Sequence, residues 1–145
     1  MNHIAIMKKE WGLTEKILQG KKSIESRWYK SRRAPWDRIR KGDMVYFKNS
    51  GELVSIKAKV RKVMQFSNLT QPKVRRILDR YGAEDGIENK EKNKFYQIFK
   101  NRKYCILMFL GNPQRTKPFS VKKSGFGSMS AWISVPNIGM IKKGN

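Results

Sequence analysis

The segment 54–66 constrains the fold most, because apolar and basic residues alternate along it. The residues of one parity are apolar, with Lys62 as the single exception, and the other parity carries Lys57, Lys59 and Arg61. An alternation of period two is typical of a half-buried β-strand. We therefore expect a long strand with one face in a core and a row of cations on the other. That row is either a solvated face or a binding surface for an anion.

The segments around this strand alternate between strand and helix patterns. The turn Asn49-Ser-Gly51 predicts a hairpin with a preceding strand at 44–48. We expect further strands at 3–7, 23–28, 104–110, 119–122 and 131–135, and helices at 13–18, 71–81 and around 95–99. Thr70 is the expected N-cap of the second helix, and Gly82 its end. This order predicts one α+β domain over residues 1–145, a small β-barrel of about six strands with flanking helices.

Positive charge dominates the composition. The 145 residues include 33 Lys and Arg against 11 Asp and Glu, a formal net charge of +22. Such an excess opposes folding by self-repulsion, and a polyanionic partner is its simplest explanation, although a generally basic surface is an alternative. Four Trp and an aromatic content of 11% argue for a packed core rather than a disordered basic tail. The acidic island at 84–91 is expected to be a solvated linker.

Cysteine and histidine are too scarce for several kinds of site. One Cys and one His exclude a disulfide framework, a multi-cysteine zinc site and a ribonuclease mechanism with paired histidines. We expect a buried, inert Cys105, an exposed His3 at the start of a strand, and no metal or cofactor. The chain shows neither a signal peptide nor a transmembrane pattern. An intracellular, cytoplasmic protein without membrane association is therefore expected.

The segment 20–28 brings charged residues close together where a Gly-ended helix leads into a strand. Lys22, Glu25 and Arg27 lie within six residues of one another, followed by Trp28. A lysine beside a carboxylate and an arginine can bind an anion or transfer a proton. These three residues are the candidate catalytic residues. The alternative is a buried salt-bridge cluster that supports the barrel.

The segments 17–27 and 39–47 resemble the ASCH domain of the PUA-like superfamily. The family pattern Gly-x-Lys-x-x-Glu-x-Arg, followed by a Gly-Asp turn into a strand, is met by Gly20, Lys22, Glu25, Arg27, Gly42 and Asp43. The resemblance implies a small PUA-like barrel with a cleft between barrel and helices, and an association with RNA. Some members are ribonucleases, and others are amidohydrolases that act on acetylated cytidine. The amidohydrolases carry a Thr nucleophile where this chain has Glu25, which argues against that activity.

These observations predict a nucleic-acid-binding domain, with RNA favoured over DNA. A basic cleft formed by Lys22, Glu25, Arg27, Trp28 and the loop 124–130 is expected to receive a base or nucleotide. The expected nucleic-acid contacts are Trp28, Arg32, Arg33, Trp36, Lys57, Lys59, Arg61, Arg76, Ser124, Ser128 and Trp132. Each Trp either stacks on a base or fills the core. The alternatives are a metal-independent ribonuclease, in which Glu25 orients Lys22 for acid–base chemistry, and a reader of modified bases in DNA.

Overall fold

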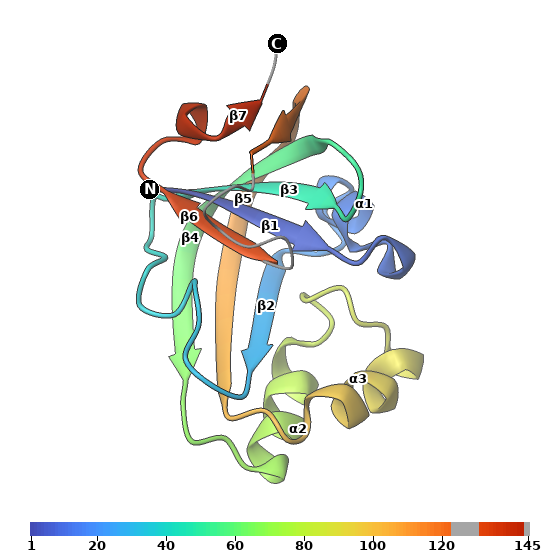
Figure 1. Ribbon diagram of the computed structural model, residues 1–145. Coiled ribbons are helices and arrows are strands. Elements are labelled where there is room, and N and C mark those ends of the chain that lie inside the picture. The colour runs from blue at the N-terminus through green and yellow to red at the C-terminus, as the bar shows by residue number, and fades with distance from the viewer. Residues whose placement is uncertain (123–130, 144–145) are drawn as a thin grey trace.

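The protein folds into one strongly curled sheet with helices packed against it (Figure 1). The computed structural model describes residues 1–122 and 131–143. The strands are β1 (Asn2–Met7), β2 (Ile24–Tyr29), β3 (Met44–Asn49), β4 (Val54–Phe66), β5 (Tyr104–Val121), β6 (Trp132–Val135) and β7 (Lys142–Lys143). The helices are α1 (Leu13–Leu18), α2 (Gln71–Tyr81) and α3 (Lys92–Phe99), with short 3-10 turns η1 (Lys9–Trp11), η2 (Asn89–Glu91) and η3 (Ile138–Met140). The α+β class and the small barrel with flanking helices are confirmed.

The sheet has the strand order β2-β5-β4-β3-β1-β6, and β7 pairs with β5. The long strands β4 and β5 pair antiparallel, and their register shifts at three places. Such bulges bend a strand and increase its twist. As a result, one half of β4 pairs with β3 while the opposite half of β5 pairs with β2, and both strands contribute to both walls of the barrel (Figure 1).

The structure corrects one strand boundary. The expected strands 104–110 and 119–122 belong to one strand, β5, which continues through a polar segment that contains two prolines. A register shift between Lys57 and Lys59 leaves Asn112 and Pro113 without a paired residue on β4, and Asn112 has a φ of 50°. The bulge therefore accommodates the proline without ending the strand.

The Lys62 exception in the alternating segment also marks a bulge. Val60 lies in the barrel core, and beyond the register shift Val63 packs against the same core. Met64 and Phe66 pack instead with the helices on the outer face. The expectation that they share the face of Val60 is wrong. Beyond the register shift both faces of the sheet are covered, so apolar residues of β4 can point to either face.

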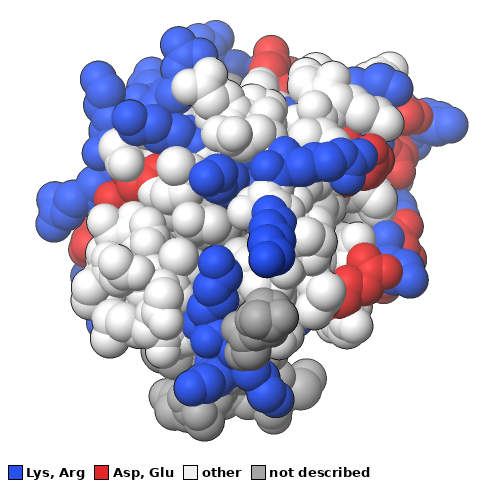
Figure 2. Space-filling view, turned by 90° about the horizontal axis from the view of Figure 1, so that it is seen from above, with Lys and Arg blue, Asp and Glu red and all other residues white. Residues whose placement is uncertain are grey.

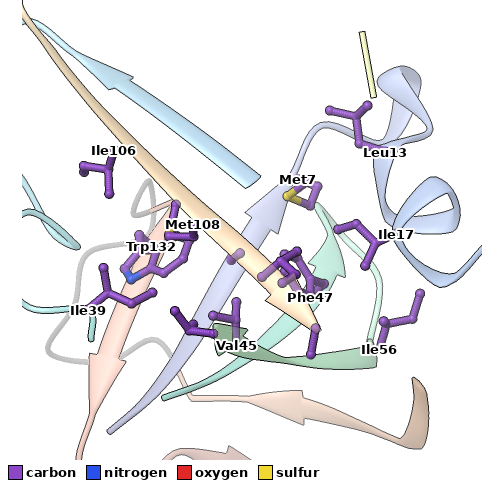
Figure 3. Close-up of a cluster of buried hydrophobic side chains, with 14 residues drawn as sticks. Met7, Leu13, Ile17, Ile39, Val45, Phe47, Ile56, Ile106, Met108 and Trp132 are labelled. Atoms are coloured by element: carbon purple, nitrogen blue, oxygen red, sulfur yellow. The ribbon is translucent and has the colours of Figure 1, made fainter. Parts of the chain in front are cut away.

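Two apolar clusters lie on opposite sides of the sheet. The barrel interior contains Val45, Phe47, Ile56, Ile106 and Met108, which are labelled among the buried side chains of this cluster in Figure 3. The outer cluster joins β2 and β5 to the helices through Trp28, Leu78, Phe95, Cys105 and Leu107. Cys105 is fully buried, as expected, and burial raises the pKa of its thiol well above the usual value.

The helices follow their expected boundaries closely. The Thr70 hydroxyl accepts from the backbone N–H of Lys73 at the start of α2, and Val74, Ile77 and Leu78 are buried. In α3, Phe95 is buried but Ile98 is 38% exposed, so its apolar face is narrower than the sequence indicates. None of the helices in the described part of the chain is long and apolar enough to cross a membrane.

His3 is fully buried at one end of the barrel, contrary to the expected exposed position. Its Nε2 lies 2.8 Å from a carboxylate oxygen of Asp43, and its Nδ1 lies 2.9 Å from the Ser134 hydroxyl. The Trp132 indole N–H donates to the same Nδ1 at 3.2 Å. Because an indole N–H can only donate, Nδ1 accepts and the neutral imidazole carries its hydrogen on Nε2. Burial lowers the pKa of His3 despite the hydrogen bond with Asp43.

Candidate functional site

A cavity of about 210 Å³ lies between β2, the end of β1 and helix α3. Aromatic rings and a cluster of charged groups line it. The aromatic lining residues are Trp11, Trp28, Tyr29, Phe95 and Phe99, and the polar ones are Lys8, Lys22, Glu25, Ser26, Arg27 and Asp85. Glu25, Ser26 and Arg27 come from β2, Lys22 lies just before this strand, and Asp85 comes from the loop that follows α2.

The Lys22 ammonium group lies at the centre of the charged cluster and is almost completely buried. It donates to the backbone carbonyls of Ile24 and Asp85, each at 2.7 Å, and to the Asp85 carboxylate. A carboxylate oxygen of Glu25 is 3.2 Å away. Burial alone would lower the pKa of Lys22, but attraction by Asp85 and Glu25 outweighs it and raises the pKa above its usual value. Lys22 therefore stays protonated, with all three N–H bonds engaged.

Asp85 corrects the expectation of a solvated acidic island. Asp85 is 5% exposed, and its second carboxylate oxygen accepts from the Ser26 hydroxyl at 2.5 Å. Burial raises the pKa of Asp85, and the charge of Lys22 opposes that shift. Gly86 has a φ of 82°, and a Cβ there would lie 3.2 Å from the Cβ of Lys22. The signal in the sequence is Asp85-Gly86-Ile87, a turn that returns to the core at the buried Ile87.

The Arg27 guanidinium group bridges the two edges of the curled sheet. Its Nε donates to a Glu25 carboxylate oxygen at 2.9 Å. Its terminal nitrogens donate to the carbonyls of Ile6 and Ala131, at 3.3 and 3.2 Å, and its guanidinium carbon is 5.1 Å from the centre of the Trp132 ring. Arg27 thus connects β2 with β1 and with the residue that precedes β6.

The charges inside the cavity are balanced. Lys22 and Arg27 are offset by Glu25 and Asp85 in direct ion pairs. Lys8 is exposed and lies over the Trp11 ring, with its ammonium 4.7 Å from the ring centre. The expected basic cleft is therefore basic at its rim, whereas its interior carries no excess of positive charge. On the face shown in Figure 2, by contrast, Lys and Arg are widely spread and acidic residues lie towards the margins.

The three tryptophans singled out in the sequence lie in different environments. Trp28 lines the cavity, stacks on Phe99 with the ring centres 4.7 Å apart, and donates its N–H to the Ser26 hydroxyl. Trp132 is 5% exposed and fills the end of the barrel beside His3. Trp36 is half-buried and contacts the edge of Tyr104. The structure thus places Trp28 at the cavity, and the packing interpretation fits Trp132.

The structure brings together part of the expected site. Lys22, Glu25, Arg27 and Trp28 line one cavity, as expected from their spacing. None of the expected phosphate contacts lines it: these are Arg32, Arg33, Lys57, Lys59, Arg61 and Arg76. Ser124, Ser128 and the rest of the loop 124–130 lie outside the described residues. Within the described ranges, no group of three His, Cys, Asp or Glu side chains is placed to hold a metal ion.

Sequence reasoning missed Asp85 and much of the aromatic wall. Trp11 contacts Phe95 edge-on with the ring centres 5.1 Å apart, and Phe95 stacks on Phe99. Phe95 and Phe99 share the apolar face of α3, and periodicity alone cannot distinguish a face that packs in a core from one that also borders a cavity. Trp11 lies in a turn without a recognisable pattern.

Comparison with known proteins adds evidence on the fold. No family model matches the sequence, and no curated protein matches it. The crystal structure of ASCH from Zymomonas mobilis has a TM-score of 0.66 and 16% identity, covering 92% of this chain and 87% of that one. A point variant of that protein gives a TM-score of 0.68 over 96% of this chain and 93% of its own. The N-terminal domain of Staphylothermus marinus McrB has a TM-score of 0.51 and 13% identity, covering 82% of this chain and 76% of that one. The chain therefore has the fold of an ASCH domain.

Proposed function

We propose that this chain, with its ASCH-type fold, is a nucleic-acid-binding domain over residues 1–145 that takes one unpaired base into the cavity beside β2. The observation that carries the proposal is the combination of an aromatic wall with a polar floor in one small space. The cavity is smaller than the roughly 300 Å³ at which pockets for drug-sized ligands begin. It suits a single ring system rather than a folded polynucleotide.

Stacking would recognise the face of the base, and hydrogen bonding would recognise its edge. A base in the cavity would contact the ring of Trp28, and base–aromatic stacking contributes about 1–3 kcal/mol per base. The Glu25 carboxylate lies on the polar floor and can accept from the hydrogen-bonding edge of the base, whereas the Ser26 hydroxyl is already bonded to Asp85 and Trp28. Unpaired bases of this kind are displayed by single-stranded RNA and by RNA loops, which favours RNA over duplex DNA. A modified base turned out of a DNA duplex is the alternative ligand.

The phosphate groups would remain outside the cavity. A phosphate in the interior would face the carboxylates of Glu25 and Asp85, whose charges already balance those of Lys22 and Arg27. Lys8 at the rim, together with Arg32 and Arg33 on an exposed loop, is available for phosphate contacts. Base recognition and phosphate binding are thus assigned to different residues.

The geometry favours binding over acid–base catalysis by Lys22. A general acid works best with a pKa near the working pH, and attraction by Asp85 and Glu25 raises the pKa of Lys22 away from that range. Its N–H bonds also point to fixed protein acceptors. Incubation of single-stranded RNA with the wild-type protein in EDTA tests this: we expect intact RNA, and cleavage would favour the ribonuclease alternative.

The binding proposal is tested by fluorescence anisotropy with labelled single-stranded RNA, single-stranded DNA and duplex DNA. Ala131 is exposed and lines the cavity, so Ala131→Trp should fill the entrance while keeping the backbone carbonyl that accepts from Arg27. The matched control is Ala83→Trp, at an exposed alanine that does not line the cavity. We expect Ala131→Trp to weaken binding of unpaired RNA about 10-fold, as for the loss of one stacked base. Equal affinities for both variants would contradict a base in the cavity.

A further inference from the structure

We propose a second nucleic-acid surface, a phosphate-binding track that crosses the outer face of β4 and continues onto α2, separate from the cavity. The inference rests on the proposed function and extends it. The track consists of the cations Lys41, Lys59, Arg61, Lys62, Arg80, Arg76 and Lys73. Among the described residues, none that lines its three hollows also lines the cavity.

The first hollow lies on the outer face where β4 and β5 bulge. It has a volume of about 820 Å³, and Lys41, Lys59 and Arg61 border it. The register shift between Val60 and Lys62 directs the adjacent Arg61 and Lys62 to solvent, where a regular strand would turn one of them inward. The bulge therefore increases the density of exposed cations at this point.

Arg61 rests against the backbone of β5 at Gly111. A Cβ at Gly111 would lie 2.4 Å from the Cδ of Arg61 and 2.9 Å from its Cγ. Any side chain at position 111 would therefore displace the Arg61 side chain from its present position. Because Gly111 does not have a positive φ, its role here is the close approach of Arg61 rather than a turn.

Aromatic contacts connect this hollow with the helix. Arg61 and Lys62 border a second hollow with Phe109, and the Lys62 ammonium is 5.2 Å from the centre of the Phe109 ring. Phe109 meets the edge of Tyr81 with the ring centres 6.0 Å apart. Arg80 donates to the Tyr81 hydroxyl at 3.0 Å. The cations of the strand and of the helix thus belong to one connected surface.

The third hollow lies between the end of β4 and α2. It has a volume of about 500 Å³, and Lys73, Arg76 and Arg80 border it. Their spacing of three and four residues places them on one face of the helix. All three side chains are exposed, whereas Val74 and Leu78 face the core.

The track carries an excess of positive charge, and Glu84 is a described carboxylate that acts on one of its cations, Arg80. No carboxylate borders any of the three hollows, and none of the track cations forms an ion pair with a described acidic residue. With a rise of about 3.3 Å per residue, β4 alone extends the track over roughly 20 Å between Lys59 and Gln65. A row of this length fits the repeating phosphates of a nucleic-acid backbone rather than a single anion.

The test compares two variants with the same change in net charge. The track variant is Lys59→Gln/Arg61→Gln/Lys62→Gln, and the control is Lys90→Gln/Lys117→Gln/Lys143→Gln, at exposed lysines outside the hollows. Anisotropy titrations with a labelled single-stranded RNA at several salt concentrations give the slope of log K against log salt. Each lost phosphate contact reduces the magnitude of this slope by about 0.7. The slope of the track variant should therefore be smaller by about 2, and that of the control almost unchanged.

A charge-neutral variant provides a second test. Gly111→Ala should displace Arg61 and reduce the slope by up to about 0.7, and Arg61→Gln should add little further loss in that background. Thermal melting confirms that both variants fold. If wild-type protein binds RNA but the track variant behaves like its control, the track is refuted and the base-binding proposal is unaffected. If the wild type binds no nucleic acid, the proposed function itself fails.

Discussion

Replacing Lys22 by methionine should destabilise the protein strongly, although the two side chains are similar in length. The substitution leaves Glu25 and Asp85 buried with Arg27 as their remaining cation. Removing one partner of a buried ion pair costs about 3–5 kcal/mol, because an uncompensated charge stays in the interior. A loss of this size is a large part of the 5–15 kcal/mol that stabilises a typical domain. It should lower the melting temperature by roughly 10 °C or more.

The pH dependence of the loss distinguishes a charge effect from a packing effect. Burial raises the pKa of Asp85 in the wild type, and without Lys22 it should rise further. A carboxyl group with a raised pKa binds its proton more tightly in the folded state, so stability falls as the pH rises from the unfolded value of 3.8 through the folded value. The free energy of unfolding of Lys22→Met should therefore be closer to that of the wild type at pH 4 than at pH 8. A packing defect would cost the same at both.

Urea denaturation followed by tryptophan fluorescence measures these differences. The second variant, Lys22→Met/Asp85→Asn, removes both charges of the pair and keeps an amide that can accept from Ser26. It should be more stable than Lys22→Met alone at pH 8, because the uncompensated carboxylate is gone. A loss of stability in Lys22→Met below about 1 kcal/mol at pH 8, or a loss that does not depend on pH, would contradict an uncompensated buried charge.

Three further predictions concern other parts of the molecule. Because burial holds the pKa of His3 below 6.5, the unfolded chain binds a proton that the folded one does not, and the free energy of unfolding should fall as the pH drops below about 6.5. Urea midpoints measured from pH 7.5 to 5 should therefore depend less on pH in His3→Gln than in the wild type. Gly86→Ala should cost about 1–2 kcal/mol, because φ is 82° there and the new Cβ presses on Lys22, whereas Gly111→Ala should leave the unfolding free energy much less affected. The buried Cys105 thiol should react with a thiol reagent only as fast as the protein unfolds, and rapid reaction of the native protein would contradict its burial.

Local patterns predicted the elements well, because alternation and caps are read over a few residues. The turn at Asn49, the N-cap at Thr70 and the strand 54–60 all have their causes within their own segments. The sequence did not indicate that the two ends of β5 belong to one strand, because the bulge that accommodates Pro113 depends on pairing with β4. The break at Lys62 was visible but not interpretable without knowing that both faces of the sheet are covered.

The candidate site was only partly predictable for a similar reason. The spacing of Lys22, Glu25 and Arg27 pointed to a common location, because they share one short segment. Asp85 enters from 63 residues away, and its charge is balanced by a lysine that no local rule assigns to it. His3 likewise looked exposed because its partners, Asp43 and Ser134, come from distant strands. Burial of a polar residue is decided by such partners rather than by its neighbours in the sequence.

The bridge formed by Arg27 has a consequence for hydrogen exchange. A strand ladder would close the barrel between β2 and β1 cooperatively, whereas among the residues the structure describes the Arg27 guanidinium group reaches the carbonyls of Ile6 and Ala131. Parting the two edges breaks these Arg27 bonds, and the described strand pairings do not include one between β1 and β2. The cavity lies beside this junction, so its entrance can widen without global unfolding. Amide hydrogens that face the junction should exchange with solvent well before those between β4 and β5.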